Sequence, residues 1–265
     1  MSNLLNDTYP LLINAISKIT EVSSIGKSGG YELPENDESD IDIYIFCSQI
    51  PEIKARQAAI VSLGDAVSKV EYSDFAGRFW GTIDFVNIDN AEICLMYFTE
   101  SYMNEEIESV LNGSRLDKEL GTFYPTGRCA TMLSMYGLFD KSRYIAKTKE
   151  RLSIYPDGLS EKMFKHHIKK ANDTESFKRA VSRGDVLFYH EVAEKAIDHY
   201  LQALFALNKC FFPSRKRSIQ FINNFGIKPP DCAERLLQMV SLGTRQETLS
   251  QSHAVWVSLY KELHG

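Results

Sequence analysis

A glycine pair, a polar loop and an apolar strand that opens with two aspartates constrain this chain more than any other segment. The run extends from Gly29 to Phe46, and Asp40 and Asp42 begin the strand. Alternate residues of a strand point to one face, about 6–7 Å apart, so the two carboxylates share a face and the intervening isoleucines face a core. Carboxylates this close repel one another unless a cation lies between them, and hard oxygen donors suit Mg2+. Gly29 and Gly30 lack a Cβ and allow phosphate oxygens to approach backbone N–H groups.

An Asp-x-Asp pair alone is more typical of a solvated loop, because short motifs have many false positives. The glycine pair, the spacing and the strand that follows favour a functional site instead. The segment resembles the nucleotidyltransferase superfamily of the DNA polymerase β type, whose signature is Gly-Gly or Gly-Ser followed about ten residues later by Asp-x-Asp on a strand. The resemblance implies that Asp40 and Asp42 bind Mg2+ and act in catalysis. It also implies that Gly29, Gly30 and Ser39 contact a nucleoside triphosphate, with ATP the favoured donor.

Composition excludes several classes of protein. The 265 residues suffice for two modest domains, and 44% hydrophobic and 25% charged residues are ordinary for a globular protein. The net charge of −5 offers no positive field to hold a long nucleic acid, so none is expected as a partner. The five cysteines never form a Cys-x-x-Cys pair, which argues against a disulfide framework or a zinc site and fits a reducing cytoplasm. No signal peptide and no apolar run of about 18 residues is found, so no membrane association is expected.

The periodicity of apolar residues predicts two domains. Helices are expected over residues 4–19, 53–67 and 102–111, and strands over residues 22–28, 40–46, 70–75, 81–88 and 91–98. From residue 127 the pattern is helical to the C-terminus, with a long helix that begins after the N-cap Asp185 and ends at Asn208. We therefore expect an α/β (α+β) nucleotidyltransferase domain with a mixed sheet over residues 1–115. An all-α helical bundle domain is expected over residues 116–265.

Nucleotidyl transfer needs a third carboxylate, and two candidates exist on the predicted hairpin. Alternation places Glu92 on one face with Cys94 and Met96, whereas Asp84 shares a face with its own strand neighbours. Residues 87–98 also resemble the hairpin of lincosamide nucleotidyltransferases, which implies that Glu92 is the general base and a metal ligand. That enzyme pairs Asp with Glu in its metal motif, whereas this chain has Asp-x-Asp, so the identity of the substrate does not follow. Asp84 stays open as a metal ligand or a structural partner.

Basic and aromatic residues outside the motif give weaker indications. Lys216, flanked by two arginines near a predicted helix start, is the preferred phosphate contact of the helical domain, although a charge run is usually a solvated face. Phe79 and Trp80 either stack on an acceptor or pack in the core, and the core is favoured. No His-Glu-x-x-His spacing occurs, so His166 and His167 are expected to be surface or pocket-lining residues.

Together these features predict an enzyme that moves a nucleoside monophosphate from a triphosphate to a hydroxyl of a small, antibiotic-like acceptor and releases pyrophosphate. One alternative is a protein-modifying nucleotidyltransferase of a toxin–antitoxin type. Another is a non-catalytic nucleotide-binding module, against which the intact carboxylates argue. A homodimer is compatible with the sequence.

Overall fold

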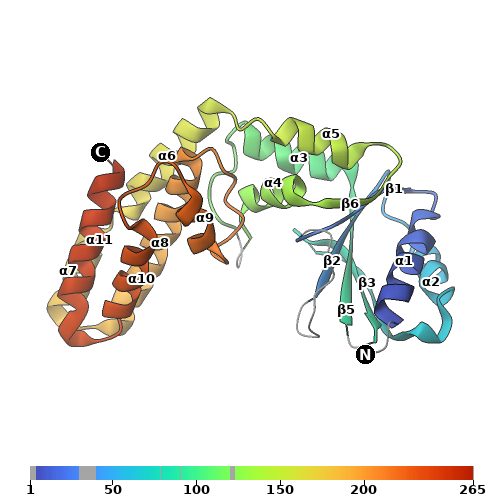
Figure 1. The fold of residues 1–265 in the computed structure, drawn as a ribbon, viewed down its shortest axis with the longest axis horizontal. Coiled ribbons are helices and arrows are strands. Elements are labelled where there is room, and N and C mark those ends of the chain that lie inside the picture. The colour runs from blue at the N-terminus through green and yellow to red at the C-terminus, as the bar shows by residue number, and fades with distance from the viewer. Residues whose placement is uncertain (1–3, 30–39, 78, 90, 120–122, 265) are drawn as a thin grey trace. The chain divides into compact units, whose positions relative to one another are not determined.

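The computed structural model describes residues 4–29, 40–77, 79–89, 91–119 and 123–264, which belong to two compact units (Figure 1). Unit 1 consists of Met1–Ser109 and Arg128–Ile154, and unit 2 consists of Val110–Gly127 and Tyr155–Gly265. The chain therefore passes from unit 1 to unit 2, returns, and leaves again. This division differs from the single predicted boundary between residues 115 and 116.

Unit 1 is built on a six-stranded sheet with the strand order β3-β4-β5-β2-β1-β6. The strands are β1 (Val22–Lys27), β2 (Ile41–Cys47), β3 (Val67–Gly77), β4 (Gly81–Ile88), β5 (Ala91–Thr99) and β6 (Tyr136–Asp140). β2 and β5 are parallel, whereas the other neighbouring pairs are antiparallel. The predicted mixed sheet is thus confirmed, and so is the β4–β5 hairpin.

Helices cover both faces of this sheet. They are α1 (Leu4–Ser17), α2 (Ile53–Val61), the 3-10 turn η1 (Gly64–Ala66), α3 (Glu100–Leu111), α4 (Pro125–Ser134) and α5 (Tyr144–Leu152). α1 and α2 lie side by side in Figure 1 and bury apolar residues such as Leu12 and Ile60 against one face of the sheet. The isoleucines of β2 belong to the same core, as their alternation predicts.

Gly26 of β1 allows the end of α4 and the start of α5 to approach the opposite face of the sheet. A Cβ added at Gly26 would lie 2.2 Å from Sδ of Met135 and 3.1 Å from Cδ1 of Ile145. We expect Gly26→Ala to lower the free energy of unfolding by about 1–3 kcal/mol, the usual cost of overpacking a core. Urea denaturation of both forms measures the change. Gly137→Ala is the control, because no atom lies within 4 Å of its added Cβ, and an equal loss in the two variants would contradict the prediction.

Unit 2 is helical and is organised around α8. Its helices are α6 (Asp157–Ala171), α7 (Thr174–Arg183), α8 (Val186–Leu207), α9 (Ser218–Asn224), α10 (Cys232–Leu242), the 3-10 turn η2 (Gln246–Thr248) and α11 (Leu249–His264). The side chain of Asp185 caps α8 by accepting a hydrogen bond of 3.0 Å from the backbone N–H of Phe188, and Asn208 is the C-cap. Both ends of this helix are therefore as predicted. Its buried residues, among them Tyr200 and Phe205, form the centre of the core of unit 2.

Two predicted elements are wrong. The helix expected over residues 53–67 ends at Val61, because the chain turns at Gly64, whose φ of +61° favours glycine, and then enters β3. The region after residue 127 is not entirely helical, because β6 pairs with β1. This pairing is what draws residues 128–154 into unit 1.

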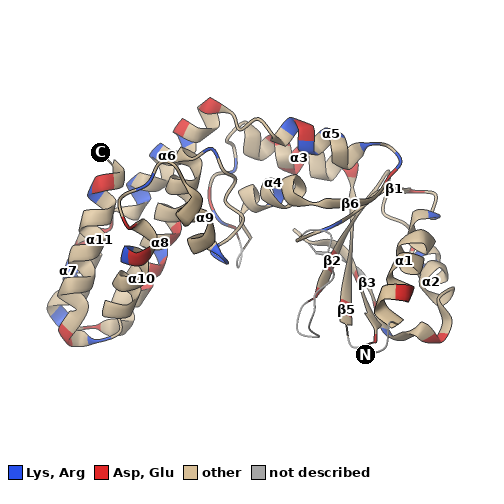
Figure 2. Cartoon of the chain, viewed as in Figure 1, with Lys and Arg blue, Asp and Glu red and all other residues tan. Residues whose placement is uncertain are grey.

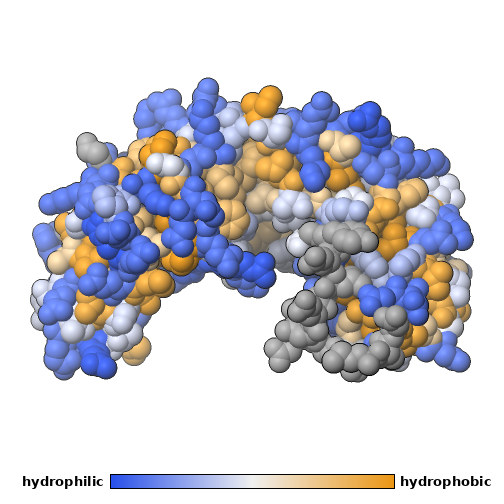
Figure 3. All heavy atoms as spheres, in the orientation of Figure 1, coloured by the Kyte–Doolittle hydropathy of each residue, from blue (hydrophilic) through white to orange (hydrophobic). Residues whose placement is uncertain are grey.

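The surface of the molecule mixes polar and apolar residues. Hydrophobic residues of unit 2 show as separate patches among hydrophilic ones (Figure 3). Of the helices that the structure describes, none combines the length and the apolar content needed to cross a bilayer.

Candidate functional site

The two predicted metal ligands lie at the start of β2, beside β5. In this parallel pair Ile41 is opposite Ile93 and Asp42 is opposite Cys94. Continuing the register by one residue places Asp40 beside Glu92. Because paired strands lie about 4.8 Å apart, the three carboxylates belong to one small area of the sheet.

These carboxylates lie on the face of the sheet opposite α1 and α2. Ile41 and Ile93 are buried in the core beneath those helices, so their neighbours along each strand point the other way. Asp40 and Asp42 are exposed, whereas Glu92 and Cys94 are half-buried. The two aspartate side chains are therefore accessible to a cation from solvent.

The pKa of the Cys94 thiol is affected by the negative charge of this area. Burial raises its pKa to about 12, and the charges of Asp42, Asp40 and Glu92 add to the effect in that order. All three carboxylates are therefore close enough to act on one sulfur atom. A divalent cation would find compensating negative charge here, supplied by hard oxygen donors of the kind that Mg2+ prefers.

The turn that follows β1 reaches the same end of the sheet. The backbone N–H of Ser28 donates to the carbonyl of Asp42 over 3.0 Å, which places the next residue, Gly29, near the aspartates. Gly29 is exposed with φ of +80°, a conformation that favours glycine, and among the described residues no atom lies within 4 Å of a Cβ added there. Gly30 and Ser39, the other predicted nucleotide contacts, lie outside the described residues.

Asp84 is on the other face of the sheet. Its carboxylate pairs with Arg56 of α2 and accepts a hydrogen bond of 3.3 Å from the backbone N–H of Ser73. The side chains of Asp84 and Arg56 are 0% and 3% exposed, and the guanidinium also lies 5.4 Å from the ring centre of Tyr97. The sheet thus separates Asp84 from Asp42, and its contacts are those of a buried structural ion pair.

Arg128, a cation that sequence reasoning missed, lies among aromatic residues further along the carboxylate-bearing face. Arg128 of α4 is buried, donates to the carbonyl of Phe79, and lies 4.8 Å from the ring centre of Phe98 and 5.8 Å from that of Trp80. Its positive charge opposes the rise in the pKa of Tyr44 that burial causes, and Tyr44 also senses Asp42. Only the fold reveals this cluster, since Arg128 is far from β5 in sequence. Trp80 is 44% exposed, so the expected core role is wrong.

Lys216, the predicted phosphate contact, belongs to unit 2. The residue precedes α9 and its side chain is exposed. Its backbone N–H donates to Oγ of Ser214 over 3.2 Å. The neighbouring Arg215 pairs with Glu194 and, over 3.2 Å, with Asp198 of α8. Part of the predicted basic run is therefore neutralised by carboxylates.

Comparisons with known proteins relate the chain to a family model and to a solved structure. A family model described as a domain of unknown function (DUF4037) matches residues 124–217. No curated protein matches the sequence. A solved structure of a nucleotidyltransferase-like protein from Exiguobacterium sibiricum is similar over 98% of this chain and 74% of that one, with a TM-score of 0.50 and 12% identity. Similarity at this identity concerns the fold, so the chain has a nucleotidyltransferase-like fold in which a mixed six-stranded sheet with helices precedes a largely helical region.

Proposed function

We propose that this protein is a Mg2+-dependent nucleotidyltransferase that moves a nucleoside monophosphate from a triphosphate to a hydroxyl and releases pyrophosphate. The observation that carries the proposal is the placement of Asp40, Asp42 and Glu92 on the solvent-facing side of one parallel strand pair. The nucleotidyltransferase-like fold supports it.

Asp40 and Asp42 are the residues that would hold the metal and, with it, the triphosphate. Their exposed carboxylates and the negative potential at Cys94 fit a hard divalent cation. Bound Mg2+ would neutralise charge on the phosphates and on the pyrophosphate leaving group. Gly29, which lacks a Cβ and follows Ser28 at the same end of the sheet, is proposed to let phosphate oxygens approach its backbone N–H.

Glu92 is the proposed general base. As the acceptor oxygen bonds to the α-phosphorus, its proton passes to the carboxylate of Glu92. The bond from phosphorus to the bridging oxygen breaks at the same time, and its electron pair leaves with pyrophosphate. Glu92 is half-buried, and the register of β2 and β5 places it beside Asp40.

We propose a small hydroxylated molecule as the acceptor and ATP as the donor, with aminoglycosides and lincosamides as the first compounds to test. The net charge of −5 gives no overall positive field to hold a long polyanion, and acidic and basic residues are interspersed along the ribbon (Figure 2). Lys216 is proposed as a phosphate contact, as predicted from the sequence.

The test is pyrophosphate release with each of the four nucleoside triphosphates, with and without the two antibiotic classes, followed by analysis of the product from labelled ATP. Label in a small molecule supports the proposal. Label in a protein band points to a protein-modifying enzyme. If no pyrophosphate appears with any acceptor, while nucleotide binding is unaffected by Asp40→Ala, the protein is a non-catalytic module.

Glu92→Gln tests the general base. We expect kcat to fall at least about 100-fold, the lower end of the contribution of general-base catalysis, while the free energy of unfolding changes little. Glu105→Gln at an exposed residue of α3 is the matched control and is expected to keep full activity. Equal rates for the wild-type protein and Glu92→Gln would show that another group takes the proton.

A further inference from the structure

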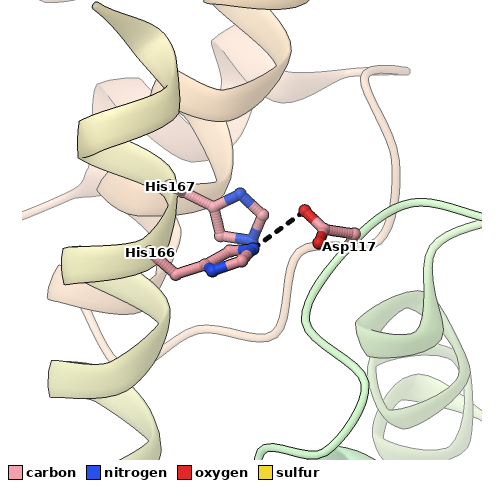
Figure 4. Close-up of side chains that lie close together, drawn as sticks. All are labelled: Asp117, His166 and His167. Atoms are coloured by element: carbon pink, nitrogen blue, oxygen red, sulfur yellow. Dashed lines mark hydrogen bonds and ion pairs between the residues drawn. The ribbon is translucent and has the colours of Figure 1, made fainter.

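Unit 2 contains a cluster of ligating side chains that the proposed reaction does not use. Asp117, in the segment between α3 and α4, faces the adjacent residues His166 and His167 of α6 (Figure 4). Nε2 of His166 lies 2.9 Å from Oδ1 of Asp117, and one ligating atom from each of the three residues lies within 4.8 Å of the others. The backbone carbonyl of Leu116 is 2.9 Å from Nε2 of His167 and adds a further oxygen.

We propose that Asp117, His166 and His167 form a second metal site, distinct from the carboxylates of unit 1. Its ligand would be a first-row divalent cation of intermediate hardness, such as Zn2+. Two imidazole nitrogens and one carboxylate oxygen are a common donor set for Zn2+, whereas Mg2+ prefers oxygen donors alone. The ligands come from a loop and a helix, so a bound cation would join the segment around Asp117 to α6.

A neighbouring histidine supplies the support that metal-bound imidazoles usually have. Nδ1 of His199 on α8 lies 2.9 Å from Nδ1 of His167. In the metal-free form, Nε2 of His167 carries the proton and donates it in a hydrogen bond to the carbonyl of Leu116. In the metal-bound form that proton would move to Nδ1, where His199 accepts it, and Nε2 would be free to bind the cation.

Lys170 is the competitor for this site. Its ammonium lies 2.7 Å from Oδ1 of Asp117, the same oxygen that His166 contacts. The side chain of Lys170 is 41% exposed, so it can move into solvent when a divalent cation binds. The lysine thus occupies, as a monovalent cation, part of the space that we assign to the metal.

Calorimetric titration of the untagged, metal-stripped full chain with Zn2+ tests the proposal, and Co2+ serves as a spectroscopic probe. Both are carried out on the Asp40→Asn/Asp42→Asn variant, which lacks the candidate site of unit 1. We expect one Zn2+ per chain and the visible absorption bands of tetrahedral Co2+. Asp117→Asn and His166→Gln are expected to weaken binding at least about 100-fold, and His199→Gln about 10–100-fold, the usual cost of a lost supporting hydrogen bond.

Two further variants keep the test decisive even if a ligand variant folds poorly. Lys170→Met is expected to tighten Zn2+ binding several-fold, because it removes the competing cation. His190→Gln alters a half-buried histidine of α8 outside the cluster and is expected to change nothing. Absence of Zn2+ binding to the folded chain, or equal binding by Asp117→Asn and His190→Gln, would overturn the proposal and leave a hydrogen-bond network in its place.

Discussion

Replacing Asp42 by asparagine is expected to lower nucleotidyl transfer by about 1,000-fold or more without unfolding the protein. A catalytic metal contributes several kcal/mol to transition-state stabilisation, and a loss of about 4 kcal/mol corresponds to about 1,000-fold in rate. Asparagine keeps the shape of the side chain but removes the charge that would hold the cation. Because Asp42 is exposed, no packing is lost. Pyrophosphate release at saturating Mg2+ and ATP measures the effect.

The control for this prediction is Asp65→Asn, the same substitution at an exposed residue of η1 in unit 1. It is expected to retain wild-type activity and stability. Treatment of the wild-type protein with a chelator of divalent cations should lower its activity to that of Asp42→Asn. Added Mg2+ should restore the activity of the wild-type protein but not that of the variant. An active Asp42→Asn protein would refute the proposed metal site.

Replacing Asp84 by asparagine is expected to lower the free energy of unfolding by about 3–5 kcal/mol, because it leaves the buried guanidinium of Arg56 without its compensating charge. The two side chains lie between α2 and the sheet, so the lost interaction holds the helix to the core of unit 1. Urea denaturation followed by circular dichroism measures the change. Asp42→Asn is expected to lose activity and keep its stability, whereas Asp84→Asn is expected to lose stability.

A paired substitution separates the structural role of Asp84 from a catalytic one. Asp84→Leu combined with Arg56→Met removes both charges and is expected to recover most of the stability that Asp84→Asn loses, since buried ion pairs are often replaceable by apolar residues. The double variant should also retain transfer activity. A stable but inactive double variant would identify Asp84, rather than Glu92, as the third carboxylate.

The candidate site illustrates how far strand alternation carries a prediction. The shared face of Asp40 and Asp42, and the placement of Glu92 with Cys94, follow from a period of two residues and from nothing else. The choice between Asp84 and Glu92 does not follow from this period, because alternation assigns faces within one strand only. That choice depends on which strands are neighbours and on which face α2 covers, and here β5 lies beside β2 while Arg56 meets Asp84.

The local features of this protein follow from short stretches of its sequence. The apolar stripe and the caps of α8, the β4–β5 hairpin and the aspartates at the start of β2 depend on residues close together in the chain. The pairing of β6 with β1, the position of Arg128 over Phe98 and the convergence of Asp117 with His166 were decided only by the tertiary structure. These contacts join segments separated by many residues, and their formation depends on the packing of the whole unit, which no local pattern of residue types records.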